Sequence, residues 1–116
     1  MRFLSRILGT ALCAGLLAMA PAAQASDSSG GYITDVLIFA DGTVLFNHSG
    51  QRGAPPACGA GLNTRWAFKA ADAAGQARLA ALLSAASMNK KVDIVGLGVC
   101  SVWGDTESLN YFVVKF

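Results

Sequence analysis

The first 25 residues limit how much of this chain is available to fold. Arg2 and Arg6 precede an uncharged run from Ile7 to Ala20, and the segment closes with Ala23-Gln24-Ala25. A basic start, an apolar run shorter than the roughly 20 residues needed to span a bilayer, and small residues before a cut are typical of a secretory signal peptide. We therefore predict cleavage after Ala25 and a secreted or periplasmic location.

The predicted mature chain is short and electrically neutral. Removal of 25 of the 116 residues leaves 91, which is enough for one domain. Arg2 and Arg6 leave with the signal, so the basic count falls from 9 to 7 and equals the 7 acidic residues. A neutral chain offers no electrostatic case for binding nucleic acid or an anionic membrane, and no membrane span is expected.

Two cysteines, Cys58 and Cys100, remain in the mature chain because Cys13 lies in the signal. An even pair in an exported chain predicts one disulfide. This bridge closes about 42 residues and contributes roughly 4 kcal/mol in the chain-entropy model. Two separate thiols are the alternative.

Five strands and one helix are expected after a polar, flexible lead at residues 26–32. Two β-rich runs flank Asp41-Gly42, the dipeptide favoured in type I′ hairpin turns because both central residues there need positive φ. Asp72 is the expected helix N-cap, and the Gly- and Pro-rich loop Ser49–Gly61 is expected to lack regular structure. The predicted elements are strands at Ile33–Ala40, Thr43–His48, Thr64–Lys69, Val92–Val99 and Leu109–Phe116, and a helix from Ala73 to Ser87 or Met88.

Alternation within the third predicted strand separates core from surface. Trp66 and Phe68 share one face, which we expect to be buried, while Arg65 and Lys69 share the other. Those two cations are expected to be solvated or to line a binding surface. The paired glycines Gly96-x-Gly98 predict a bulge or the close approach of another segment in the fourth strand.

The order β-β-β-α-β-β is the element order of the OB-fold, a five-stranded Greek-key barrel with its helix between strands 3 and 4. We therefore expect a mainly β domain at residues 33–116, with one helix, one disulfide and OB-fold-like architecture. Another small α+β sheet with one packed helix is the alternative.

The titratable residues give little support for catalysis. A hydrolytic triad would need His48, the single histidine, with Ser49 or Ser101, but we interpret His48 as a strand-end residue beside a mobile loop. Asp105 and Glu107 lie two apart and would face the same way on an extended segment, although solvated loop acids are the more common case. Neither a metal site nor a cofactor is expected, and the chain is predicted not to be an enzyme.

The densest polar and aromatic stretch is the predicted loop Cys100–Ser108. Aromatic faces stack on sugar rings, and carboxylates and hydroxyls bond to sugar hydroxyls, so a loop of this composition suits a glycan held by a preorganised site. The alternative is that the indole plugs one end of the barrel. The candidate ligand-binding residues are Ser101, Trp103, Asp105, Thr106 and Glu107.

The chain resembles the small binding subunits of bacterial toxins with a pentameric B component, in particular the subtilase cytotoxin binding subunit and its relatives. The similarity covers Ile33 to Phe116 in architecture and is strongest around Cys58, Arg65-Trp66-Ala67-Phe68 and Gly98 to Glu107. It implies a ring-shaped homo-oligomer, a glycan ligand and a catalytic toxin subunit as a partner. No sugar-contacting position is transferred from the family.

These observations favour a lectin-like binding module that assembles as a homo-oligomer, because the first and last strands are apolar on both faces. The second hypothesis is a small periplasmic inhibitor or stress-related protein that binds another protein through Ser49–Gly61. The third is an enzyme that uses Asp105 and Glu107.

Overall fold

The computed structural model describes residue 15 and residues 25–116. Apart from Gly15 and Ala25, the predicted signal peptide lies outside the described residues.

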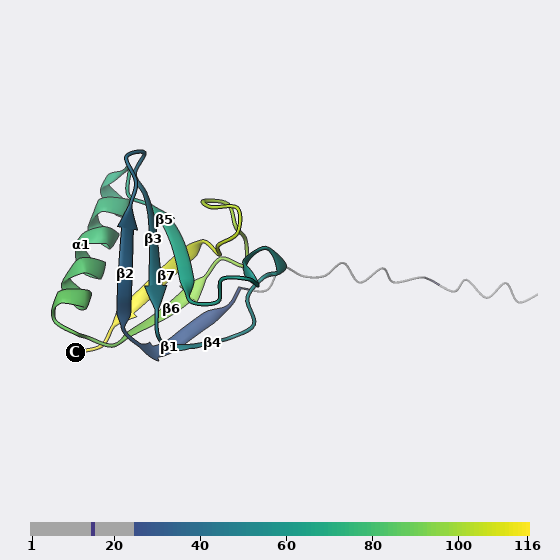
Figure 1. The fold of residues 1–116 in the computed structure, drawn as a ribbon, viewed down its shortest axis with the longest axis horizontal. Coiled ribbons are helices and arrows are strands. Elements are labelled where there is room, and N and C mark those ends of the chain that lie inside the picture. The colour runs from purple at the N-terminus through teal and green to yellow at the C-terminus, as the bar shows by residue number, and fades with distance from the viewer. Residues whose placement is uncertain (1–14, 16–24) are drawn as a thin grey trace, which may run out of the picture.

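Two antiparallel sheets and one helix make up the domain (Figure 1). Sheet A has the strand order β4-β1-β6-β7, and sheet B has the order β2-β3-β5. The mainly β class with one helix is confirmed, whereas a closed barrel is not shown, because the strands form two separate sheets. The elements are β1 (Asp27–Gly31), β2 (Ile33–Ile38), β3 (Thr43–His48), β4 (Gln51–Arg52), a 3-10 turn (Ala57–Gly59), β5 (Arg65–Lys69), α1 (Ala73–Ser87), β6 (Val92–Gly96) and β7 (Leu109–Val114).

The segment predicted as a flexible lead is instead strand β1. Its second residue, Ser28, pairs with Ile94 of β6 on one side and with Arg52 of β4 on the other. Serine and glycine have low strand propensity, but tertiary context overrides propensity when both edges of a strand are hydrogen-bonded. Ser26 and Ser28 are consequently buried.

The predicted hairpin is confirmed by the antiparallel pairing of β2 with β3, but its turn is not type I′. Gly42 has φ +83°, whereas Asp41 is not among the described residues with positive φ. The Gly42 N–H donates to the Phe39 carbonyl at 3.0 Å, so an ordinary β-turn over Phe39–Gly42 ends in one left-handed glycine. Two hydrogen bonds lower the pKa of Asp41 to about 2: the larger effect comes from the Thr43 backbone N–H and the smaller from the Lys69 ammonium.

Helix α1 begins and ends as expected. Asp72 caps it by accepting a hydrogen bond from the Gly75 N–H at 2.7 Å, and Asn89 follows its end with φ 51°. The loop Ser49–Gly61, predicted to be irregular, contains β4 and the 3-10 turn. It is fixed by the predicted Cys58–Cys100 disulfide, which is confirmed.

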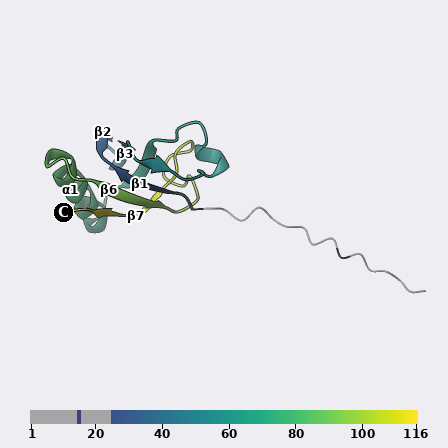
Figure 2. The same cartoon turned by 90° about the horizontal axis from the view of Figure 1, so that it is seen from below.

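The core lies between the two sheets and α1, and Figure 2 shows the helix at one end of the domain, away from the residue-25 end. Trp66 is fully buried, as predicted, and so is its neighbour on the same face, Phe68. Burial of large side chains of this kind contributes about 1.5–3 kcal/mol each. The buried core residues are Val44, Phe46, Trp66, Phe68, Leu82, Ala85, Val92, Ile94 and Leu109.

Candidate functional site

Residues 97–108, named the crossing loop from here on, lie over the outer face of sheet B. Arg65 and Ala67 alternate with Trp66, so they point away from the core cluster. Arg65 Nε donates to Thr106 Oγ1 at 2.9 Å, and the Ala67 N–H donates to the Glu107 carbonyl at 3.2 Å. Ala67 is fully buried although it faces outward, because the crossing loop covers it.

An aromatic pair marks the point where this loop meets the hairpin. The Trp103 ring centroid lies 5.0 Å from that of Phe39, with the two planes tilted by 32°. Phe39 is 38% exposed and Trp103 is half-buried, so the pair is open to solvent on one side. Leu37, two positions before Phe39, is also exposed and extends the apolar surface along β2.

Two exposed polar residues, Ser101 and Asp105, each lie two positions from Trp103 along the crossing loop. Asp105 is exposed and its Oδ1 accepts from Arg65 Nη2 at 2.6 Å. The hydrogen bond from the Thr106 hydroxyl lowers the pKa of Asp105 most, and the bond from Arg65 lowers it further. The carboxylate therefore stays ionised at neutral pH. Ser101 is exposed, and its hydroxyl lies 2.9 Å from that of Ser108.

The other two candidate ligand contacts, Thr106 and Glu107, are both buried. Thr106 bonds to Arg65, and Glu107 points to the opposite side of the loop, into the interior. Asp105 and Glu107 therefore do not face the same way, which removes the geometry needed for an acid/base pair.

Glu107 is the centre of a buried polar cluster. Its Oε1 accepts from Arg52 Nη2 at 2.8 Å and from the Ser26 hydroxyl. Its Oε2 accepts from the backbone N–H groups of Ser26 at 3.1 Å and Gly98 at 3.0 Å. A Cβ at Gly96 would overlap this carboxylate, which explains the predicted close approach at the paired glycines.

Arg52, which sequence reasoning missed, holds this cluster against the core. Its guanidinium carbon lies 3.7 Å from the centroid of the Trp66 ring, a cation–π geometry. Burial lowers the pKa of Arg52, and the hydrogen bond that Arg52 donates to Glu107 opposes that shift. The paired glycines Gly96 and Gly98 indicated that another group lies close to this strand, but they did not indicate that the group is Glu107 with its partner Arg52.

His48 is the last residue of β3, which confirms its interpretation as a strand-end residue, and it is buried. Its Nε2 donates to the Val92 carbonyl at 2.7 Å, and its Nδ1 lies 2.7 Å from the Ser28 hydroxyl, which donates to it. Burial lowers the pKa of the imidazole. Within residues 25–116 no carboxylate is hydrogen-bonded to His48, so the structure shows no hydrolytic triad around it.

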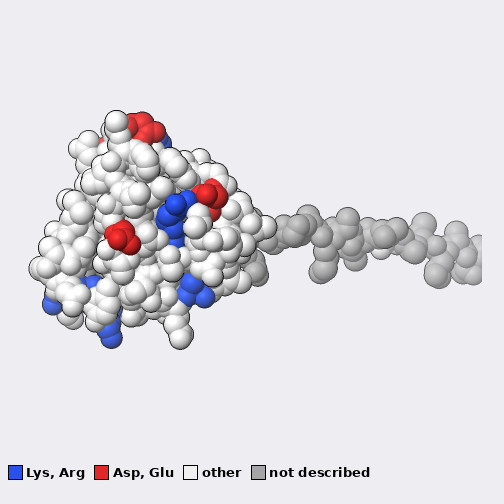
Figure 3. All heavy atoms as spheres, in the orientation of Figure 1, with Lys and Arg blue, Asp and Glu red and all other residues white. Residues whose placement is uncertain are grey.

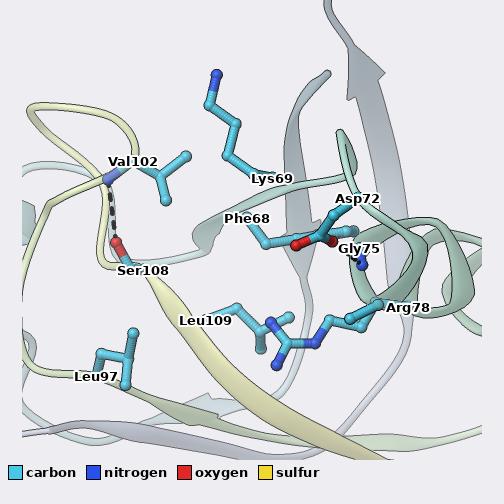
Figure 4. Close-up of a pocket in the computed structure, with 10 residues that line it drawn as sticks. Phe68, Lys69, Asp72, Gly75, Arg78, Leu97, Val102, Ser108 and Leu109 are labelled. Atoms are coloured by element: carbon cyan, nitrogen blue, oxygen red, sulfur yellow. Dashed lines mark hydrogen bonds between the residues drawn. The ribbon is translucent and has the colours of Figure 1, made fainter. Parts of the chain in front are cut away.

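A hollow of about 280 Å³ lies on the other side of the crossing loop, between that loop and the start of α1 (Figure 4). Phe68, Leu97 and Leu109 supply apolar lining. The Arg78 guanidinium lies beside Leu109 in Figure 4 and forms no ion pair with any described residue. No local sequence pattern indicated this hollow, because its lining comes from segments distant along the chain.

Charges of both signs are scattered over the face shown in Figure 3, and no large patch of one sign is visible there. Among the described residues, no group of three His, Cys, Asp or Glu side chains is placed to hold a metal ion. In the same part of the chain, no helix has the length and apolarity required to cross a membrane.

Searches with protein-family models, curated proteins and solved structures gave no match to this chain.

Proposed function

We propose that this chain is an exported, lectin-like module that binds a glycan over the crossing loop. The observation that carries the proposal is the half-exposed Trp103–Phe39 pair beside the exposed Asp105 and Ser101. A sugar ring needs an aromatic face for its C–H groups and polar groups for its hydroxyls, and this surface offers both within one short segment.

The loop is well suited to hold that surface in one shape. The Cys58–Cys100 disulfide anchors it near its start, and Arg65 bonds to both Thr106 and Asp105 near its end. Preorganisation of this kind lowers the entropy lost on binding. We assign direct contact with the glycan to Ser101, Trp103 and Asp105, and assign the buried Thr106 and Glu107 to support of the loop.

The strand order is consistent with an OB-fold-like barrel as the scaffold. Sheet B ends at β5, whose Ala67 forms a parallel bridge with Ser108 just before β7. Strand β7 pairs with β6, and β6 with β1, which leads directly into β2. A barrel of five strands follows if β1 and β2 act as one bent strand.

Glycan-array binding tests the proposed ligand class. We expect the oxidised wild-type protein to bind a defined set of glycans, and Trp103→Ala to lose at least tenfold in affinity. Tyr111→Ala, which removes another exposed aromatic side chain from β7, should bind as the wild type does. Absence of glycan binding, or equal binding by Trp103→Ala, contradicts the proposal. Capture of a host protein through Ser49–Gly61 would instead support an inhibitor.

Assembly as a homo-oligomer, in the form of a pentamer that carries a catalytic toxin subunit, completes the proposal. Strand β2 is an edge of sheet B and exposes Leu37 and Ile38, while the edge strand β7 exposes Tyr111 and Val113. Exposed apolar edges of this kind are sites for pairing with another copy. Sedimentation at micromolar concentration should show an oligomer that Ile38→Lys dissociates, and a wild-type monomer contradicts assembly.

A further inference from the structure

Ser26 occupies an unusual position for the first residue after a predicted cleavage site. Its backbone nitrogen lies 3.1 Å from Glu107 Oε2, and the residue is only 5% exposed. Ala25, immediately before it, is exposed. The bond expected to be cut, Ala25–Ser26, is therefore the bond at which the chain enters the folded domain.

We propose that cleavage of this bond converts the Ser26 nitrogen into an α-ammonium group that forms an ion pair with the buried Glu107 carboxylate. The inference depends on cleavage after Ala25 and is independent of glycan binding. A signal peptidase-type protease and one water molecule supply the step: the C–N bond breaks, Ala25 keeps a carboxylate, and the Ser26 nitrogen becomes an ammonium ion.

The surrounding groups already aim this nitrogen at the carboxylate. The Ser26 carbonyl accepts from the Gly96 N–H at 2.8 Å, and the Ser26 hydroxyl bonds to Glu107 Oε1. Both contacts hold the residue in place with its nitrogen facing the carboxylate. Before cleavage the nitrogen donates one uncharged N–H to the carboxylate, and after cleavage it carries a positive charge of its own, which turns the same contact into an ion pair.

Glu107 and Arg52 are the charged groups that bond to Ser26, and they act on a new ammonium group in opposite directions. The Glu107 carboxylate attracts it, whereas Arg52, whose Nε donates to the Ser26 hydroxyl at 2.9 Å, repels it. The two cations meet different oxygens of the carboxylate, because Arg52 Nη2 donates to Oε1 and the Ser26 nitrogen faces Oε2. The other donor to Oε2, the Gly98 N–H, carries no charge.

Cleavage of the signal also changes the stability of the domain. The precursor can reach the same backbone arrangement with the Arg52–Glu107 ion pair, but it lacks the second cation beside Glu107 and is the less stable form. The domain gains its full stability after removal of the signal, which keeps the chain easier to unfold before export and firmer afterwards.

Comparison of three N-termini tests the ion pair. The variants are a chain that begins at Ser26, the same chain acetylated on the Ser26 nitrogen, and the full precursor, all with the disulfide oxidised. The shortened chain keeps both sheets, the helix and the core described above. We expect the free Ser26 chain to melt about 5 °C or more above the other two, which should match each other.

Two controls keep this result specific. Glu107→Gln should abolish the difference between the free and acetylated chains, unless that variant fails to fold. Independently of any variant, the free Ser26 amine should react with an amine reagent at least tenfold more slowly than the amine of a chain that begins at Ala25. Equal melting temperatures, or equal reaction rates, would overturn the ion pair.

The mass of the protein purified after export tests cleavage separately. A mass that begins at Ser26 supports the maturation step. Cleavage at any other bond overturns it, whatever the melting temperatures, and leaves the glycan proposal unaffected.

Discussion

Single buried polar residues account for features of this domain that hydrophobic packing alone does not explain. Glu107 and Arg52 form an ion pair with side-chain exposures of 0% and 7%. A buried pair of this kind adds little to the free energy of unfolding compared with apolar residues of the same size. Removal of one partner is strongly destabilising, because the other charge is then buried without a counter-ion.

Arg52→Met tests this cluster. We expect the free energy of unfolding to fall by about 3–5 kcal/mol, because Glu107 loses its cation and the Trp66 ring loses its stacked guanidinium. The double variant Arg52→Met/Glu107→Leu should recover part of that loss. Urea unfolding of the oxidised proteins gives both values. A single-variant loss below about 1 kcal/mol would show that the pair is not buried in solution.

His48 should make stability depend on pH in the range where its ordinary pKa lies. Its folded pKa is below the ordinary 6.5, so below that pH the unfolded chain binds a proton that the folded chain does not. The contribution of the neutral His48 to stability is therefore fully present above pH 6.5. The free energy of unfolding falls as the pH drops from 6.5 toward the folded pKa, by up to about 1.4 kcal/mol per pH unit.

Urea unfolding between pH 7.5 and 5 measures this effect, in a window that lies above the lowered pKa values of Asp41, Asp93 and Asp105. His48→Gln should remove the slope near pH 6.5, since His48 is the single histidine of the chain. A slope that persists in His48→Gln would assign the pH dependence to another group.

At the scale of elements, local sequence signals were reliable where the structure is local. Asp72 and the helical periodicity predicted α1, and Asp41-Gly42 predicted the β2–β3 hairpin. The turn type was wrong because Gly42 alone adopts the left-handed conformation. Strands β1 and β4 were missed, since their Ser, Gly and Gln residues become strands only by pairing with distant segments.

The crossing loop should depend on its covalent anchor. Replacement of both Cys58 and Cys100 by Ser should lower the free energy of unfolding by about 2–4 kcal/mol and weaken glycan binding, because the loop gains freedom that binding must remove. Urea unfolding and glycan titration measure the two effects. Unchanged glycan affinity in the folded double variant would show that the disulfide does not preorganise the site.

At the scale of the whole molecule, the candidate site arises from long-range contacts. Trp103 was predicted as a candidate, but its contact with Phe39 requires the hairpin and the crossing loop to meet, which no local pattern specifies. The same holds for Arg52 and Glu107, which are 55 residues apart. Composition predicted which residue types the site would use, and the fold determined that Trp103 and Asp105 are accessible while Glu107 is buried.

The two tryptophans offer the most direct test that the crossing loop binds glycans. Trp66 is fully buried and Trp103 is half-exposed, so each indole N–H reports on a different part of the molecule in a nitrogen–proton correlation spectrum. We predict that titration with a panel of neutral mono- and disaccharides at millimolar concentration shifts the Trp103 signal for at least one sugar and leaves that of Trp66 in place. No shift of Trp103 with any sugar, or shifts confined to residues remote from the crossing loop, would contradict the account.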